Sequence, residues 1–263
     1  MCGIVAYIGP RDATPIIMNG LKRLEYRGYD SAGMATIDAG TINLRRDAGK
    51  LARLQSLVSK QPLSGNIGVG HTRWATHGEP NARNAHPHMG ATGKVVLVHN
   101  GIVENYIELR QQLIEDDIKL QSDTDSEVIV HLVERYLSED NCLEESVRQT
   151  IGLLQGANSV VLISTTEPDK IIAARVGNAG GIAIGNGNNE MFIASDMPAI
   201  LEHTRRIAFL EPGWLATVTK TGFVTRTMMG ESINSEIHNI PWDPVAAEKG
   251  NYRHFMQKEI HEQ

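Results

Sequence analysis

Cysteine is nearly absent from this chain of 263 residues, which contains only Cys2 and Cys142. Two cysteines are too few for a disulfide framework and fit a reducing compartment. Long hydrophobic runs are missing as well, because runs such as 95–98 fall far short of the roughly 20 residues that a membrane span requires. No basic segment followed by an apolar one opens the chain, so no signal peptide is visible. We therefore expect a cytoplasmic protein that does not bind a membrane.

An excess of positive charge is also lacking. Lys and Arg number 25 against 31 Asp and Glu, which gives a formal charge of −6, and no Lys/Arg run stands out. A nucleic-acid partner is therefore not expected. The chain is long enough for one large core, or for one domain with an appendage.

The first candidate for chemistry is Cys2, in the sequence Met1-Cys2-Gly3. Cellular processing usually removes an initiator Met that precedes a small residue, which would make Cys2 the first residue. It would then carry both a thiol and an α-amine, and the amine can accept the thiol proton directly or through one water. The alternative is a small buried hydrophobe, as for most free cysteines. Residues 3–8 predict a buried strand that would hold Cys2 on a rigid element.

A predicted helix over residues 13–24 leads into the irregular segment 25–33, which contains two glycines, two tyrosines and an Arg/Asp pair. The segment has the period of neither helix nor strand and predicts a structured loop. Arg27 and Gly28 lie at its centre. Two interpretations stay open: a packed turn with a surface ion pair, or a loop that lines a polar site.

The segment 71–80 places Arg73, Thr76 and His77 in one predicted loop beside the bulky Trp74. An Arg guanidinium can hold a carboxylate through two parallel hydrogen bonds. A loop that ends in Gly78 can also move as a lid over what it binds. This segment therefore predicts a binding loop.

A strong strand over residues 94–99 is followed by Asn100-Gly101. This dipeptide is a strong signal for a hairpin turn. The alternative is an oxyanion hole, in which the Asn100 side-chain amide and the Gly101 backbone N–H are the donors. Five histidines lie between His71 and His99, but their spacing matches no compact zinc pattern, so we expect no metal.

The polar cluster 122–127 precedes a helix predicted over residues 125–137. Asp123 or Thr124 is expected to cap this helix. A spare carboxylate such as Asp125 could instead bind a substrate ammonium. Beyond residue 158, short alternating strands follow, and two blocks of strands around a block of helices predict a layered α/β or α+β domain.

Several of these segments together resemble the glutaminase domain of the glucosamine-6-phosphate synthase family, within the class II (N-terminal-Cys) glutamine amidotransferases. The carriers of the resemblance are CGIV at 2–5, RLEYRGYDSAG at 23–33, HTRWATHGEP at 71–80, NAHPH at 84–88, VHNGIVEN at 98–105 and SDTDSEV at 122–128. The likeness runs from Cys2 to Gln263. It implies an α+β fold, the four-layer αββα sandwich of the N-terminal nucleophile (Ntn) hydrolases.

The resemblance also implies a role for each matching residue. Cys2 is similar to the nucleophile that attacks the side-chain amide of glutamine, and Asn100 and Gly101 match the oxyanion hole. The resemblance implies binding of glutamine by a further set of residues: Arg73, Thr76 and His77 at the α-carboxylate, Asp125 at the α-ammonium, Trp74 on the closing loop, and Arg27 and Gly28 on a loop that borders the site. No cofactor is implied.

The activity implied is hydrolysis of glutamine to glutamate and ammonia through a γ-glutamyl thioester, with the ammonia used to convert fructose 6-phosphate to glucosamine 6-phosphate. Two alternatives stay open: an N-terminal-Cys amidase with another substrate, and a glutamine-binding module without turnover if Met1 is retained. The implied partner is a sugar-phosphate isomerase domain of the same polypeptide, in a full-length enzyme that forms a homo-oligomer.

We expect a glutaminase domain over residues 2–229, and a linker leading into a missing isomerase domain over residues 230–263. One run departs from the family pattern. Asn178-Ala179-Gly180-Gly181 stands where Ser-Pro-Leu-Val is more usual. Because it lies outside the motifs above, we expect it to alter local packing rather than chemistry.

Overall fold

Alternate residues of the first strand, β1 (Gly3–Ile8), belong to two different hydrophobic cores in the computed structural model, which describes residues 2–139 and 141–241. Ile4, Ala6 and Ile8 contribute to a core formed by residues of both sheets. Val5 and Tyr7 pack on the other side, among residues of the first helices. This alternation follows from the two-residue period of a strand. It places β1 in an inner layer of the fold.

In the described part of the chain, the strands form two antiparallel sheets, one of eight strands and one of seven. The larger sheet has the order β15 (His238–Asn239), β11 (Arg206–Phe209), β9 (Ala183–Asn186), β10 (Met191–Ala194), β1, β4 (Ile67–Arg73), β2 (Ser31–Asp38) and β3 (Thr41–Ala48). The smaller sheet has the order β14 (Ser232–Ile233), β13 (Gly222–Thr227), β12 (Trp214–Thr219), β8 (Ile171–Val176), β7 (Asn158–Ser164), β6 (Val95–Gly101) and β5 (His88–Met89). Since β1 is bonded to β10 and to β4, it is held on both sides.

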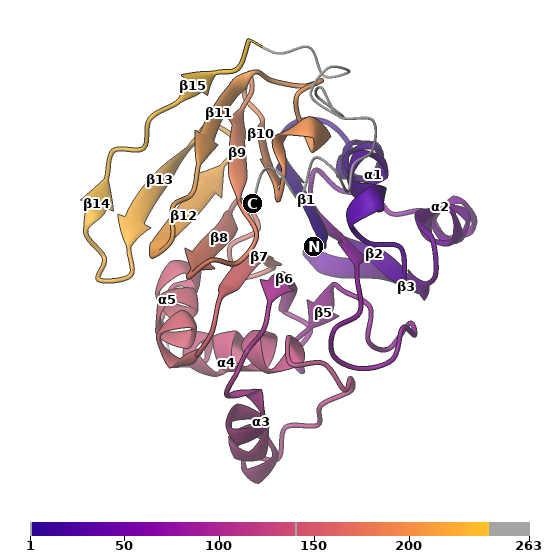
Figure 1. Ribbon diagram of the computed structural model, residues 1–263, viewed down its shortest axis with the longest axis vertical. Coiled ribbons are helices and arrows are strands. Elements are labelled where there is room, and N and C mark those ends of the chain that lie inside the picture. Colours follow the sequence, from indigo (N-terminus) through magenta and orange to yellow (C-terminus); the bar gives the residue numbers. More distant parts are fainter. Residues whose placement is uncertain (1, 140, 242–263) are drawn as a thin grey trace.

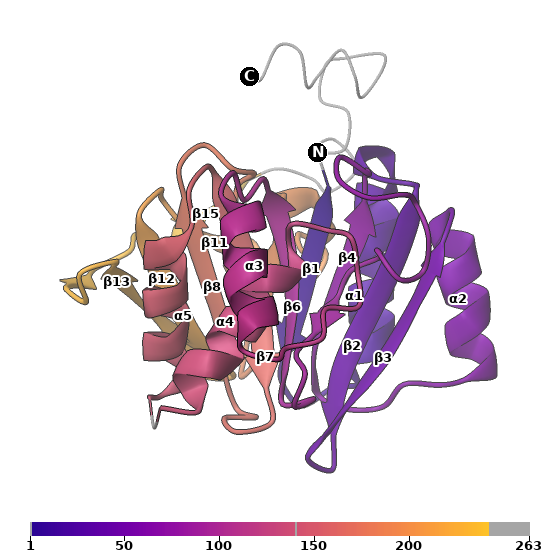
Figure 2. The same ribbon diagram turned by 90° about the horizontal axis from the view of Figure 1, so that it is seen from below.

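Helices cover the outer face of each sheet. The helical elements are α1 (Ala13–Leu24), η1 (Glu25–Arg27), α2 (Leu51–Lys60), α3 (Tyr106–Glu115), α4 (Glu127–Leu137), α5 (Leu143–Leu153) and η2 (Met197–Ala199). Figures 1 and 2 show α1 and α2 on one side of the molecule and α3, α4 and α5 on the other. Each helical layer shares its own core with the sheet beneath it. The predicted four-layer αββα sandwich is confirmed.

Several local predictions differ from the structure. The strand predicted over residues 66–70 continues to Arg73, because Arg73 still pairs with Ser31 of β2. Asn100 and Gly101 form no hairpin turn, since they remain in β6 and pair with the first two residues of β7.

The start predicted for the helix over residues 125–137 is also wrong. Helix α4 begins at Glu127 and its N-cap residue is Ser126, so neither Asp123 nor Thr124 caps it. The Ser126 hydroxyl interacts with Nδ1 of His99 at 2.8 Å, a contact that the local sequence does not encode. A long-range partner therefore takes the side chain that would otherwise cap the helix.

Residues just beyond 229 add short edge strands to both sheets. Strand β14 pairs with β13, and β15 pairs with β11. The boundary at residue 229 stays a prediction, and the rest of the predicted linker, residues 242–263, lies outside the described residues. None of the described helices is long and apolar enough to cross a membrane.

Candidate active site

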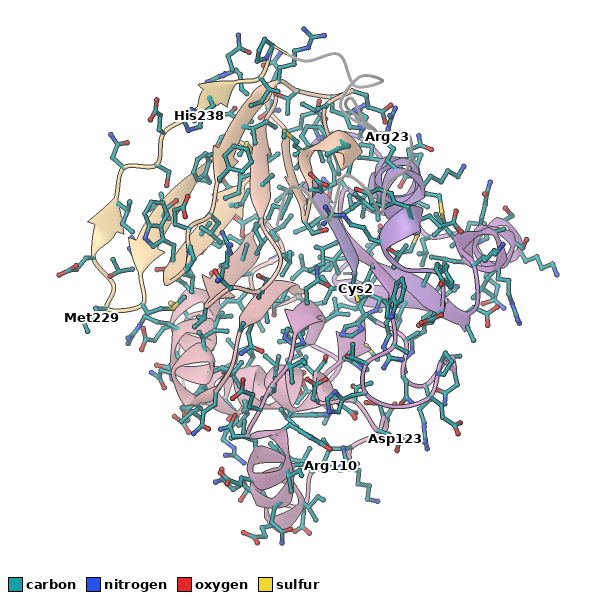
Figure 3. All side chains as sticks on the ribbon, in the orientation of Figure 1. Cys2, Arg23, Arg110, Asp123, Met229 and His238 are labelled. Carbon is teal, nitrogen blue, oxygen red and sulfur yellow. The ribbon has the colours of Figure 1, made fainter. Side chains whose placement is uncertain are left out.

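Cys2 immediately precedes β1 and lies near the centre of the view in Figure 3. Its Sγ accepts a hydrogen bond from the backbone N–H of Trp74 across 3.2 Å. The pairing of β1 with β4 brings these residues together, because Gly3 lies opposite Thr72. The Cys2 carbonyl accepts a longer hydrogen bond from the Ser195 hydroxyl at 3.5 Å. Backbone and side chain of this half-buried residue are therefore both held.

Asn100 and Gly101, at the end of β6, lie beside Cys2. The Asn100 Nδ2 donates a hydrogen bond to the Cys2 carbonyl at 3.0 Å. Gly101 has a φ of +136°, and a Cβ atom at this position would lie 2.1 Å from the Ala157 carbonyl oxygen. Only glycine fits such a backbone. The structure thus brings the two predicted oxyanion donors next to the predicted nucleophile.

A cavity of about 360 Å³ opens beside the thiol. Its volume is in the range of sites for small molecules. Five of the predicted site residues line it: Cys2, Trp74, Thr76, Asn100 and Gly101. The other lining residues were not predicted as site residues: Ile102, Glu104, Ala157, Asn178, Ala179 and Gly180.

The 178–181 run lies outside the sequence motifs, yet three of its residues line this cavity. The expectation that it alters packing rather than chemistry stays a prediction. A Cβ atom on Gly180 would lie 3.6 Å from Nδ2 of Asn100. The Gly180 carbonyl accepts a hydrogen bond from the Ser159 hydroxyl at 2.7 Å, which fixes the run against β7. A side chain at position 180 would therefore reach the predicted oxyanion donor.

The sheet order explains why this run reaches the site. Val176, the last residue of β8, pairs with Asn158, which pairs in turn with Gly101. The segment after β8 therefore leaves the sheet at the edge where Asn100 and Gly101 lie. This order depends on pairing between strands distant in sequence, so spacing along the chain gave no signal for it.

Arg73 does not line the cavity. It is buried at the end of β4, and its guanidinium donates to the backbone carbonyls of the loop that follows. One bond goes to His77, and longer ones reach Gly78 at 3.4 Å and Glu79 at 3.5 Å. The group predicted to hold a carboxylate therefore holds the 74–80 loop in this structure.

Asp125 is buried and does not line the cavity, and its two carboxylate oxygens already have partners. One oxygen accepts from the backbone N–H of Val103 at 2.9 Å, and the other accepts from the Ser126 hydroxyl at 3.3 Å. The charges of Asp125 and Cys2 both act on Arg73. Arg73 therefore lies near both the thiol and Asp125, and neither Arg73 nor Asp125 lines the cavity.

The predicted residues at the edge of the site are also engaged by protein groups. Arg27 donates to Asp196 at 2.6 Å, and a Cβ atom on Gly28 would lie 2.7 Å from the carbonyl carbon of Arg73. The ring of His77 meets that of Tyr106 edge-on, 5.5 Å between centroids. None of Arg27, Gly28 and His77 lines the cavity.

A larger depression of about 860 Å³ lies beside α1, between Lys22, Tyr29 and Lys50. It contains neither a thiol nor a buried amide donor. The smaller cavity at Cys2 is therefore the candidate reaction site.

The Cys2 thiol needs a base to remove its proton. Burial raises the pKa of the thiol, while the hydrogen bond from Trp74 and the positive charge of Arg73 oppose this shift. Because burial is the largest effect, the thiol is protonated near neutral pH, and a proton acceptor must form the thiolate. Burial likewise lowers the pKa of Arg73, against the charges of Cys2, Asp125 and Asp30.

The described residues contain no group of three or more His, Cys, Asp or Glu side chains able to hold a metal ion. Two of the buried histidines bond to neighbouring polar groups. Nε2 of His88 lies 3.1 Å from the Thr124 hydroxyl, and Nε2 of His99 lies 2.9 Å from the side-chain oxygen of Asn158.

Comparison with known proteins identifies the family. The family model described as "glutamine amidotransferase domain" matches residues 58–251, which is most of the chain. This chain belongs to the glutamine amidotransferase domain family. The match begins after Cys2, so membership of the family rests on the sequence from residue 58 onward and not on Cys2. The predicted resemblance to the class II amidotransferases is confirmed.

Two curated relatives extend the match over the whole chain. Glutamine–fructose-6-phosphate aminotransferase (isomerizing) of Symbiobacterium thermophilum is 46% identical over 263 residues, which are 100% of this chain and 42% of that protein. The enzyme of the same name from Pyrococcus horikoshii is 48% identical over 264 residues, 100% of this chain and 44% of that protein. This amidotransferase domain therefore spans less than half the length of these relatives.

A solved structure supports the fold. Glutamine phosphoribosylpyrophosphate amidotransferase from B. subtilis, complexed with ADP and GMP, has a TM-score of 0.74 and is 24% identical. The similarity covers 89% of this chain and 50% of that one. At this level of identity, the comparison shows a shared fold.

Proposed function

We propose that this domain hydrolyses the side-chain amide of glutamine, with Cys2 as the nucleophile. The observation that carries the proposal is that the Cys2 thiol and the Asn100 amide line one cavity, with Nδ2 of Asn100 held 3.0 Å from the Cys2 carbonyl. Membership of the glutamine amidotransferase domain family supports glutamine as the substrate.

The proposed reaction starts when the α-amine of Cys2, freed by removal of Met1, accepts the thiol proton. The sulfur attacks the side-chain amide carbon of glutamine, and the carbonyl oxygen becomes an oxyanion. The second N–H of Asn100 and the backbone N–H of Gly101 stabilise this oxyanion. Its collapse breaks the C–N bond, the amine returns the proton to the leaving group, and ammonia departs. Water then hydrolyses the γ-glutamyl thioester to glutamate and restores the thiol.

Binding of the charged head of glutamine involves Arg73 for the α-carboxylate and Asp125 for the α-ammonium. Both side chains are hydrogen-bonded to backbone groups in this structure. Because Arg73 is bonded to the 74–80 loop, this loop must rearrange before Arg73 can bind the α-carboxylate. We propose that Trp74, Thr76 and His77 move with this loop and close over the substrate. Arg27 and Gly28 form the fixed border against which it closes.

The ammonia is proposed to serve the conversion of fructose 6-phosphate to glucosamine 6-phosphate in a longer, homo-oligomeric polypeptide. Support comes from the two relatives, which are both named glutamine–fructose-6-phosphate aminotransferase and of which this chain matches 42% and 44%. A sugar-phosphate isomerase domain in the remainder would consume the ammonia. This domain alone should then release glutamate from glutamine and form no amino sugar from fructose 6-phosphate.

Glutamate release by the purified chain tests the proposal. Intact mass first establishes that Met1 has been removed. We expect Asn100→Ala to lower kcat by about 10²- to 10³-fold with little change in KM, because the amide acts on the developing oxyanion. A processed chain that binds glutamine without releasing glutamate would refute the hydrolase and favour a binding module.

A further inference from the structure

The orientation of the Asn100 side chain is fixed by its two neighbours. One end of the amide lies 3.0 Å from the Cys2 carbonyl oxygen, which can only accept a hydrogen bond. The NH₂ group must therefore face Cys2, and the side-chain oxygen faces Nε2 of His71 at 3.0 Å. Since that oxygen can only accept, Nε2 of His71 must carry the proton.

His71 is held rigidly in a neutral form. It is fully buried in β4, where its backbone pairs with Ile4 of β1 on one side and Gly33 of β2 on the other. Burial lowers the pKa of His71 to about 3, so the ring carries one proton near neutral pH. Its other nitrogen, Nδ1, has no hydrogen-bond partner. The bond to Asn100 is thus the side-chain hydrogen bond that the ring makes, and the backbone of His99 also acts on the ring.

We propose that His71 is a positioning residue for the oxyanion hole. It locks the Asn100 amide so that one N–H bonds to Cys2 and the other points toward the cavity. Without this bond, the amide can rotate about its last torsion and present its oxygen to the reaction centre. An oxygen there would repel the developing oxyanion. The inference rests on the proposed function, because it assigns His71 a part in the same hydrolysis.

His86 provides a matched control. Its ring packs against that of His71 with the centroids 4.3 Å apart, and it is buried to a similar degree. Neither of its ring nitrogens has a hydrogen-bond partner, and it makes no bond to Asn100. If His71 served packing alone, substitutions at positions 71 and 86 would change kcat equally. If His71 positions Asn100, only the substitution at position 71 lowers kcat.

The experiment compares four variants of this chain by melting temperature and glutaminase kinetics. His71→Phe and His86→Phe keep an aromatic ring but remove the nitrogens. His71→Gln keeps an N–H donor near the position of Nε2, and His71→Asn carries the same amide on a shorter side chain that stops short of Asn100. We expect His71→Phe and His71→Asn to lower kcat more than tenfold with KM nearly unchanged. His71→Gln should restore most of kcat, and His86→Phe should keep it.

A double substitution tests whether His71 acts on kcat through Asn100. In an Asn100→Ala background, His71→Phe should lower kcat less than twofold further, because its target is gone. Equal kcat for His71→Gln and His71→Asn, or equal losses for His71→Phe and His86→Phe, would overturn the inference. If a Phe variant does not fold, the Gln/Asn pair decides alone. Failure of the proposed function is distinct, since the unsubstituted chain would then release no glutamate.

Discussion

The backbone N–H of Trp74 donates a hydrogen bond to Sγ of Cys2 across 3.2 Å, although 72 residues separate them in the chain. This contact links the proposed nucleophile to the first residue of the 74–80 loop. Movement of the loop therefore changes the environment of the thiol. Chemistry and binding at this site are expected to depend on each other.

Cys2→Ala should abolish glutamate release and leave the fold intact, because the attacking atom is lost while β1 keeps its pairing on both sides. Cys142→Ala should retain activity, since Cys142 is exposed and precedes α5 on the outer helical layer. Glutamate release and thermal melting of both variants check this. An active Cys2→Ala together with an inactive Cys142→Ala would refute the mechanism.

Substitutions at the charged groups should act mainly on binding. We expect Arg73→Ala and Asp125→Asn to raise KM for glutamine at least tenfold, because they remove charge-assisted contacts made in both the ground state and the transition state. Asn at position 125 still offers an acceptor to the Val103 N–H, so it tests charge with little loss of structure.

Glu104 is the matched control for Asp125, because it also carries a carboxylate and lines the cavity. Glu104→Gln should change KM less than twofold if Asp125 holds the ammonium. A large increase in KM for Glu104→Gln and none for Asp125→Asn would transfer that role to Glu104. Steady-state kinetics on the two variants in parallel give the answer.

Gly180→Val should narrow the cavity beside Asn100. A Cβ atom here would lie 3.6 Å from Nδ2 of Asn100, which is ordinary van der Waals contact, so the fold should tolerate the side chain. The two added methyl groups project into the space next to the amide, and we expect KM for glutamine to rise severalfold. Gly181→Val is the control, because Gly181 does not line the cavity. Equal KM values for the two variants would contradict this assignment.

Stability should fall steeply in mild acid. Burial lowers the pKa of His71 and His88 to about 3, that of His86 well below its ordinary value, and that of His99 in the same direction. Unfolded histidines bind protons below about pH 6.5, so below that pH the unfolded state holds more protons, down to about pH 3 at His71 and His88. The contribution of these histidines to the free energy of unfolding is therefore at its maximum above pH 6.5, and it decreases as the pH falls below that value. Each histidine contributes up to about 1.4 kcal/mol per pH unit.

Urea unfolding of the unsubstituted chain and of His86→Phe at pH 7, 6 and 5 measures this slope. The variant should lose stability more slowly on acidification, by the equivalent of one proton. Identical slopes would show that His86 does not stay neutral in the folded state.

Local sequence predicted the elements well where a single period dominates. The helix predicted over residues 13–24 matches α1 because its buried residues recur at helical spacing. Prediction failed where distant strands decide the outcome. Asn100-Gly101 has the local signature of a turn, yet pairing with β7 keeps both residues in a strand. Of the predicted site, five residues line one cavity: Cys2, Trp74, Thr76, Asn100 and Gly101. The roles of all ten predicted residues remain predictions.

The hydrogen bonds of Arg73 to the carbonyls of residues 77–79 have a consequence for how the site responds to its ligand. A carboxylate that binds this guanidinium competes with the backbone carbonyls of the loop. It can bind only when the hydrogen bonds from Arg73 to the loop break. Part of the affinity for the ligand is thus converted into loop displacement. The position of the loop then differs between the empty and the occupied site, so any group in contact with the loop responds to binding without touching the ligand.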